Sequence, residues 1–280
     1  FARIVAIAHT HPGRDKRANH PLRAFVERAC YRAVSGVVFN SEANRIEWSR
    51  KLGLSRSGDV VIRHGIPGPD TSVPDDYPPK PPDTVDFLFL GFFYPWKGQT
   101  EFLEAWKLAT EALSSRRSTG KGHGEALLPR LIFVGDGQRL NEAELRAKQL
   151  GIEGNVVFLG ARSDGARYFN GCDVAVLLPV EPEAFGLVLL EAMSRSKPLI
   201  SSKLGGIPEV VKDGETGCLV DPKRPEETAG AIVGLAGSAD ERTRLGRNGH
   251  ERWAKLFMDT RMLDEYDRYF RRLGGMTGEQ

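Results

Sequence analysis

The sequence predicts an α/β protein whose main domain is a doubly wound parallel sheet, and two observations carry this prediction. From residue 85 onward, short apolar runs alternate with longer segments of helical periodicity. The apolar runs are continuous, which is typical of strands that are covered on both faces. Strands and helices in regular alternation indicate parallel βαβ units. The predicted strands are VDFLFLG, LIFVGDG, NVVFLG, DVAVLLP, PLISS and GCLV, and GQTEFLEAWKLATEAL and QRLNEAELRAKQL are among the predicted helices.

Length and composition fit one large or two small globular domains. The chain has 280 residues, of which 40% are hydrophobic and 27% charged. No apolar run approaches the roughly 18 residues that a membrane span needs. The cysteines, Cys30, Cys172 and Cys218, are far apart and favour a reducing cytoplasm over a disulfide framework or a zinc site. The chain opens inside an apparent strand, ARIVAIAH, so we expect it to be part of a longer protein.

A proline-rich stretch, PGPDTSVPDDYPPKPPD, divides the chain, because its prolines and aspartates cannot build a core element. We therefore predict a first domain over residues 1–68, a linker over 69–84, a main domain over 85–256 and a terminal helix over 257–280 that returns to the first domain. The charged, glycine-rich residues 114–127 are expected to form an exposed excursion.

Charge is unevenly distributed along the chain. Residues 1–68 hold 12 Lys and Arg against five Asp and Glu, a net of +7, which leaves −5 for the remainder. This basic part is a candidate for peripheral contact with anionic lipid at the inner face of a membrane, or with a phosphorylated acceptor; a solvated basic face is the alternative. Interleaved aromatic residues are missing, so we expect no nucleic acid partner. The basic residues concerned are Arg14, Lys16, Arg17, Arg23, Arg28 and Arg32.

The segment EPEAFGLVLLEAM, residues 181–193, places two carboxylates, Glu183 and Glu191, on either side of an almost wholly apolar run. Without a polar stripe, the run is predicted to be a buried helix. Its first N–H groups would point out of the helix at Phe185, Gly186 and Leu187. Such a helix start attracts anions.

Three other strand ends carry polar groups, and ligands of doubly wound sheets bind at these ends. Lys97 opens a helix after the first strand of the main domain. The glycines of the Gly135-Asp136-Gly137 turn would let a ligand approach the backbone. Arg162 and Arg167, after NVVFLG, could stack on or hydrogen-bond to a base. Each feature alone is also compatible with an ordinary solvated surface.

Taken in order, GFFYPWKG, LIFVGDG, VVFLGARSD, the Glu183–Glu191 segment and PLISSKLGGIPEVVKDGETGCLV resemble the C-terminal half of the family 4 glycosyltransferases. These are retaining enzymes of the GT-B fold, which has two Rossmann-like domains. The resemblance covers nearly all of residues 85–275. It implies that the C-terminal domain is complete and that residues 1–68 are the last part of an N-terminal domain.

The resemblance also implies roles for individual residues. Glu191 would hold the ribose hydroxyls of a nucleotide, Glu183 would contact the donor sugar, and Lys97 would offset charge on the diphosphate. His9, at the end of a strand in the first domain, would reach the sugar across the cleft. The amides of Phe185, Gly186 and Leu187 would take the distal phosphate, and Gly135, Arg162 and Arg167 would complete the donor site.

The implied reaction moves a sugar from a UDP- or GDP-linked donor to a hydroxyl of a glycan, a lipid-linked compound or a small molecule, with retention of configuration. We expect no cofactor and no metal, since the sequence has no Asp-x-Asp to hold Mg²⁺ on the diphosphate. The chain alone is expected to bind nucleotide without transferring sugar, because the missing segment would help to hold the acceptor.

Two positions and one short segment depart from the family pattern. Phe92 stands where arginine usually follows the glycine, so half of the expected cationic clamp is absent. The interdomain crossing reads RHGIP, residues 63–67, and Val180 replaces a common serine. Two alternatives therefore stay open, a sugar-nucleotide-binding subunit without turnover and a nucleotide-sugar epimerase or phosphorylase of the same fold.

Overall fold

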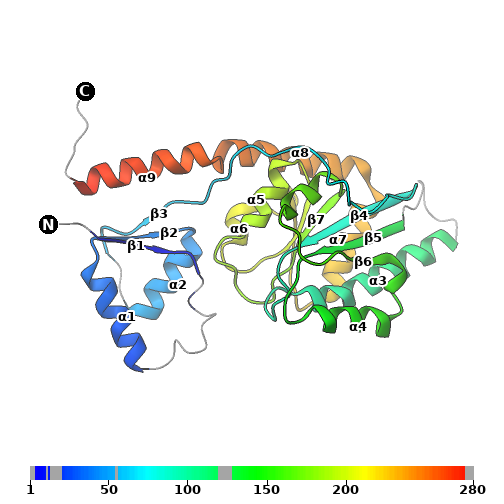
Figure 1. The fold of residues 1–280 in the computed structure, drawn as a ribbon, viewed down its shortest axis with the longest axis horizontal. Helices are drawn as coiled ribbons and strands as arrows, with labels where there is room; N and C mark the ends of the chain where they lie inside the picture. Colours follow the sequence, from blue (N-terminus) through cyan, green and yellow to red (C-terminus); the bar gives the residue numbers. More distant parts are fainter. Residues whose placement is uncertain (1–3, 11, 13–20, 54–55, 119–127, 275–280) are drawn as a thin grey trace.

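The computed structural model describes residues 4–10, 12, 21–53, 56–118 and 128–274. Figure 1 shows two parallel sheets side by side and a long C-terminal helix that extends from the larger sheet to the smaller one. Among the described residues, no helix is both long and apolar enough to cross a lipid bilayer.

The smaller sheet has three parallel strands in the order β1-β2-β3. The central strand β2 is buried, and its Val38 lies between Ile7 and Val60 of the outer strands. Of the basic residues singled out above, Arg28 and Arg32 are exposed on α1, whereas residues 13–20 and the side chain of Arg23 lie outside the described part. The elements are β1 (Val5–Ala8), α1 (Pro21–Ala33), β2 (Gly36–Phe39), α2 (Glu42–Leu52) and β3 (Val60–Val61).

The larger sheet has six parallel strands in the order β6-β5-β4-β7-β8-β9, and all six predicted runs are confirmed as strands. The chain moves outward from β4 to β6 and then returns to the other side of β4 with β7. Such a reversal opens a crevice between the carboxyl ends of the two central strands. The strands are β4 (Thr84–Leu90), β5 (Leu128–Val134), β6 (Val156–Phe158), β7 (Val174–Leu177), β8 (Leu199–Ser202) and β9 (Gly217–Val220).

Helices cover the larger sheet, with α3 packed against α4 and α7, and α5 packed against α8. The helix α3 continues to Ser118, so residues 114–118 of the predicted excursion are helical; the side chain of Ser115 bonds to the Glu111 carbonyl within this last part. Residues 119–127 lie outside the described part. The helices are α3 (Gln99–Ser118), α4 (Leu140–Leu150), η3 (Glu153–Asn155), η4 (Gly165–Asn170), α5 (Leu187–Ser194), α6 (Ile207–Val210), α7 (Pro225–Gly237) and α8 (Ala239–Leu256).

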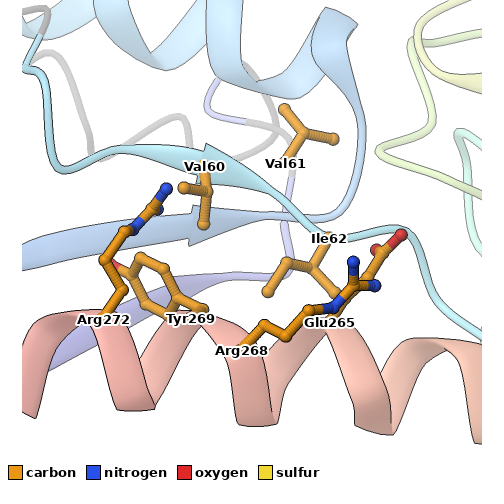
Figure 2. Close-up of a pocket in the computed structure, with 7 residues that line it drawn as sticks. All are labelled: Val60, Val61, Ile62, Glu265, Arg268, Tyr269 and Arg272. Carbon is orange, nitrogen blue, oxygen red and sulfur yellow. The ribbon is translucent and has the colours of Figure 1, made fainter. Parts of the chain in front are cut away.

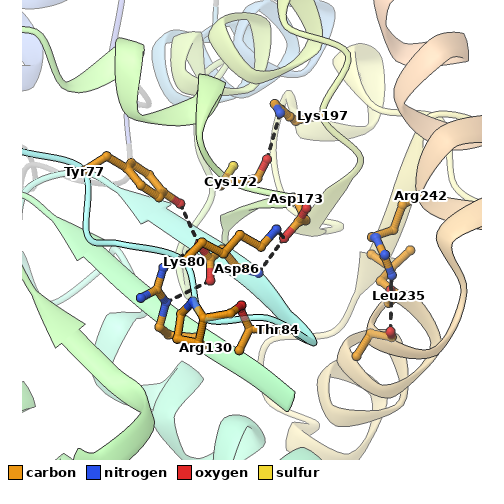
Figure 3. Close-up of polar contacts among 12 residues, drawn as sticks. Tyr77, Lys80, Thr84, Asp86, Arg130, Cys172, Asp173, Lys197, Leu235 and Arg242 are labelled. Carbon is orange, nitrogen blue, oxygen red and sulfur yellow. Dashed lines mark hydrogen bonds and ion pairs between the residues drawn. The ribbon is translucent and has the colours of Figure 1, made fainter. Parts of the chain in front are cut away.

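The end of the larger sheet at which β4 begins, opposite the carboxyl ends of the strands, contains a completely buried carboxylate, Asp86. The strand register sets it opposite Arg130 of β5. The Arg130 guanidinium donates to Asp86 through Nε at 2.9 Å and Nη2 at 2.7 Å, and the Tyr77 hydroxyl donates at 3.1 Å (Figure 3). Arg130 also donates to the carbonyls of Pro78 and Pro79. This network attaches the proline-rich segment to the sheet.

The last helix, α9 (Asp259–Gly274), lies along the smaller sheet. Its Tyr269 is buried against Val38 and Ile62, and the tyrosine hydroxyl donates to the Gly58 carbonyl at 3.0 Å. Figure 2 shows Tyr269 below Val60, with Arg268 and Arg272 on the same helix. The chain thus returns to the first sheet after completing the second, although the division of residues 1–280 into four segments stays a prediction.

Candidate active site

The Glu183–Glu191 segment occupies the loop after β7 and the helix α5. Gly186 precedes this helix with φ of 89°, in the left-handed region that favours glycine, and an added Cβ would lie 2.9 Å from Leu189. Glu183 is buried, with 9% of its surface exposed. The prediction of a buried run is wrong at Leu187, the first residue of α5, which is 46% exposed, whereas Ala184 and Phe185 before it are buried. The helix buries one face, at Leu189 and Leu190, and leaves Leu187 outside the core.

Lys97, from the loop after β4, pairs with Glu183 across the crevice. The Lys97 Nζ lies 3.0 Å from Glu183 Oε2, and the two side chains are 21% and 11% exposed. The neighbouring Gly98, with φ of 80°, packs so closely that an added Cβ would lie 1.9 Å from the Leu178 carbonyl oxygen. Only glycine permits this approach of the two loops. The pair therefore places a cation and an anion at one point between the two central strands.

A cavity of about 460 Å³ opens beside this pair. Its wall is apolar at Leu90, Val134 and Val188, and Lys97 and Glu191 are two of its six charged groups, the others being Asp136, Arg162, Asp164 and Arg167. The remaining lining comes from strand ends and loops, namely Gly91, Phe92, Gly135, Asp136 and residues 161–167. An apolar wall with a few charged groups is typical of a site for a small organic ligand.

Among the acidic groups of this cavity, Glu191 has a pKa that its surroundings clearly shift. Burial raises its pKa from the ordinary value of a glutamate, and the nearby Arg195 opposes this shift. Arg195 donates to the backbone carbonyl of Glu191 at 3.0 Å. The Glu191 carboxylate is thus held in a place where ionisation has a cost, which a ligand with hydrogen-bond donors would offset.

Two histidines from the smaller sheet face the start of the motif. The rings of His9 and His64 stack with centroids 5.3 Å apart and an angle of 6°, and His64 meets the Phe185 ring edge-on at 5.3 Å. Burial and the neighbouring His9 lower the pKa of His64, which favours its neutral form at pH 7. The structure thus brings His9 toward the Glu183–Glu191 segment through His64, which sequence reasoning did not select.

Arg162 and Arg167 line the cavity as predicted residues of its rim, but both are also attached to the segment between the two sheets. Arg162 Nε lies 2.8 Å from Asp76 Oδ2. Arg167 lies 3.4 Å from the Asp70 carboxylate, and its Nη2 donates to the Ser72 hydroxyl at 2.8 Å. These ion pairs bring the connecting segment to the edge of the cavity.

A glycine-rich turn after β8 packs against the backbone of Glu183. Gly205 has φ of 60°, and an added Cβ would lie 2.2 Å from the Glu183 carbonyl oxygen, while the Gly206 N–H donates to that oxygen at 2.8 Å. Two residues beyond Ile207, Glu209 accepts from the Ala43 N–H at 2.8 Å and from Arg63 at 3.0 Å. The turn therefore links the motif to the smaller sheet.

Most of the predicted site residues lie at one crevice. Lys97, Gly135, Arg162, Arg167 and Glu191 line the same cavity. Glu183 contacts the cavity-lining Lys97 through their ion pair. At the start of α5 lie Phe185, Gly186 and Leu187. Sequence reasoning missed Val188, although its spacing of three residues from Glu191 places both on one face of the helix. In the described part of the chain, no group of three or more His, Cys, Asp and Glu is arranged to hold a metal ion.

Comparison with known protein families identifies the family of this chain. The family model described as "Glycosyl transferases group 1" matches residues 76–252, more than half of the chain. The chain belongs to this family. The family predicted from the Glu183–Glu191 segment is therefore confirmed.

Curated relatives of this group 1 chain include bacterial sugar-transferring enzymes. The O-antigen chain mannosyltransferase C of Escherichia coli is 29% identical over 95% of this chain and 68% of its own length. The N-acetyl-alpha-D-glucosaminyl L-malate synthase of Bacillus anthracis is 33% identical over 49% of this chain and 36% of its own length. A D-inositol 3-phosphate glycosyltransferase of Corynebacterium glutamicum is matched over 25% of its length. The chain thus spans only part of these relatives.

Solved structures confirm the GT-B fold for this group 1 chain. HepE of Anabaena, solved in complex with UDP and glucose, has a TM-score of 0.77 at 22% identity, over 96% of this chain and 71% of that one. The sucrose-phosphate synthase of Thermosynechococcus elongatus has a TM-score of 0.78 at 23% identity, over 98% and 68%. At these identities the likeness establishes the fold.

Proposed function

We propose that the chain supplies the donor-binding part of a glycosyltransferase that moves a sugar from a nucleoside diphosphate to an acceptor hydroxyl. The observation that carries this proposal is the cavity at the ends of β4 and β5 beside α5, which has Glu191 in its wall and the Lys97–Glu183 pair at its edge. An ionised carboxylate accepts from two ribose hydroxyls, and an ammonium attracts a diphosphate. The nucleotide complexes known for HepE are compatible with such a ligand.

Within this proposal the sugar lies toward Glu183, with His9 on the opposite wall. The acceptor oxygen bonds to the anomeric carbon from the side of the leaving group as the sugar–phosphate bond breaks, and its proton passes to the departing phosphate. This front-face route retains configuration and needs no dedicated protein base. Lys97 and the first N–H groups of α5 stabilise the charge that develops on the diphosphate.

Acceptor and location are part of the same proposal. A glycan, a lipid-linked compound or a small molecule would supply the hydroxyl, and the protein would work in the cytoplasm, with its basic first domain near the inner face of a membrane. The exposed Arg28 and Arg32 on α1 favour contact with anionic lipid.

The test combines a donor screen with a transfer assay. Ligands that bind the folded state raise the melting temperature, so UDP- and GDP-linked sugars can be ranked by thermal shift. The donor selected is then labelled in its sugar and supplied to the full natural protein with candidate acceptors. Labelled product supports transfer, whereas an epimerised donor indicates an epimerase. Cleavage of the donor that depends on phosphate indicates a phosphorylase, and binding without any reaction indicates a subunit without turnover.

Glu191 gives the first prediction. Glu191→Ala should weaken UDP or GDP binding by about 1.5–3 kcal/mol, the scale of a hydrogen bond to a charged group. Because burial raises the pKa of Glu191, acidification protonates this group earlier than an ordinary carboxyl and should weaken binding by the wild type. Glu191→Gln should remove this part of the pH dependence of binding. The part that comes from titration of the nucleotide itself is the same for wild type and variant. Calorimetric titrations at several pH values measure the difference.

The same raised pKa has an effect on stability with the opposite sign. A carboxyl group whose pKa is raised in the folded state stabilises that state when protonated, and this contribution is lost as pH rises through the folded-state pKa. The ligand-free Glu191→Gln protein should therefore melt at a higher temperature than the wild type at neutral pH. An unchanged UDP affinity together with an unchanged melting temperature would remove Glu191 from the site.

Metal independence is a separate prediction. If the diphosphate charge is balanced by Lys97 and the start of α5, then EDTA should leave the transfer rate of the full natural protein unchanged, and added Mg²⁺ or Mn²⁺ should not raise it. Loss of transfer in EDTA with recovery on adding Mn²⁺ would show that a metal ion takes part.

One observation favours the alternative of a binding subunit without turnover. Phe92, which stands where the family usually has arginine, is 62% exposed and lines the cavity with Lys97. We predict that Phe92→Arg strengthens diphosphate binding by about 1 kcal/mol, since the added cation would be only partly desolvated. Phe92→Leu is the matched control without a charge, and it should leave UDP affinity nearly unchanged. Equal effects of both replacements would show that the ring matters for packing.

A further inference from the structure

A second cavity, of about 270 Å³, lies at the junction of the two sheets and shares no lining residue with the cavity of Glu191. Four cations line it, and each comes from a different segment. Arg63 follows β3, Lys212 follows α6, Arg252 belongs to α8 and Arg261 belongs to α9. Nothing in the proposed transfer reaction uses these side chains.

Backbone carbonyls hold three of the four cations in place. Arg252 donates to the carbonyls of Val210 at 2.8 Å and of Glu209 at 2.7 Å. Arg261 donates to the Leu256 carbonyl at 2.8 Å, and Lys212 donates to the Pro208 carbonyl at 3.2 Å. A carbonyl oxygen orients a cation without neutralising its charge.

Carboxylates balance this charge only in part. Glu209 is the one acid among the lining residues, and it divides its oxygens between Arg63 at 3.0 Å and the Ala43 N–H at 2.8 Å. Glu265 pairs with Arg261 at 2.6 Å from outside the lining. Burial and the nearby Arg63 lower the pKa of Arg252, and Glu215 opposes this shift. Arg63 and Arg252 therefore repel each other across the cavity.

We propose that this cavity binds a small soluble phosphate compound, such as pyrophosphate or a phosphate monoester. Guanidinium groups match phosphate oxygens in planar pairs of hydrogen bonds, and an anion would relieve the repulsion between the cations. The volume is below the range of about 300–1,000 Å³ that is usual for drug-sized ligands, which favours a small anion over a nucleotide.

The bound anion would join parts of the chain that lie far apart in the sequence. Arg63 lies on the crossing between the sheets, Arg261 on the helix that returns to the smaller sheet, and Lys212 and Arg252 on the larger domain. The buried Phe257 also lines the cavity, and its ring meets Phe185 of the motif at 5.9 Å. A bound anion is thus in a position to hold the crossing, residues 63–67, against the Glu183–Glu191 segment.

Calorimetric titration with pyrophosphate tests this proposal. Every protein in the test carries Lys97→Ala, so that the other cavity lacks its diphosphate-attracting cation. In this background Lys212→Ala and Arg261→Gln should each weaken pyrophosphate binding roughly tenfold, the lower end of the scale for a hydrogen bond to a charged group. Both replaced side chains reach solvent, so the variants should fold, and melting curves check this.

Arg268→Gln, on the same helix α9 but outside this cavity, is the matched control and should leave pyrophosphate affinity unchanged. Absence of pyrophosphate binding in the Lys97→Ala protein would overturn the proposal. So would an unchanged affinity in either Lys212→Ala or Arg261→Gln, or an equal loss in Arg268→Gln. Donor binding is measured separately with UDP in the Lys97 wild type, so the two sites can fail independently.

Discussion

Replacing Lys97 by alanine is expected to lower kcat/KM for sugar transfer by the full natural protein by about 10²- to 10³-fold. This is the scale for removing one group that stabilises charge developing in a transition state. Lys97 reaches both the cavity and Glu183, so its ammonium would meet the diphosphate next to the bond that breaks. Phe92 does not supply a second cation there.

Two variants separate charge stabilisation from structure. Lys97→Arg keeps a cation beside Glu183 and should retain most of the activity that Lys97→Ala loses. Glu183→Gln should lower kcat/KM while sparing UDP affinity, since Glu183 is proposed to contact the sugar. Equal kcat/KM in Lys97→Ala and wild type would refute the role of Lys97, and a large fall in melting temperature would assign it to structure.

Asp86→Ala is expected to destabilise the fold by about 3–5 kcal/mol, the usual cost of removing one partner from a buried ion pair. The replacement would leave the Arg130 guanidinium, 13% exposed, without its buried carboxylate. It would also detach Tyr77, and with it part of the segment between the sheets. Urea unfolding followed by circular dichroism measures the loss.

Lys80→Ala is the matched control at the same end of the sheet. Lys80 pairs with Asp173 at 2.5 Å, but it is 37% exposed, and such pairs contribute less than about 1 kcal/mol (Figure 3). A loss below 1 kcal/mol for Asp86→Ala as well would mean that the Asp86 network is no stronger than a surface pair.

The parallel sheet could be predicted because its strands are nearly continuous apolar runs, which only two covering layers explain. Placement of polar groups at strand ends followed from the same topology and brought Lys97 and Glu191 to one cavity. Burial of Asp86 could not be foreseen, because its partner Arg130 is reached only through the register of β4 and β5. Local patterns do not encode that register.

Other features of the site depend on contacts between distant segments. An apolar pattern does not distinguish a residue that faces the core from one that faces solvent, so the exposure of Leu187 was missed. The stack of His9 on His64 joins two strand ends of the smaller sheet. The family resemblance selected His9 but gave no sign of its neighbour.

The ion pairs of Arg162 with Asp76 and of Arg167 with Asp70 mean that the rim of the cavity and the chain between the sheets share the same guanidinium groups. In Figure 1 this chain runs from β3 across to β4. Under the proposed function, a base that engages Arg162 would change the free energy of its bond to Asp76, and by thermodynamic reciprocity the state of that bond would change the affinity for the base by the same factor. Nucleotide binding and the attachment of the connecting segment would then be coupled through the same two arginines.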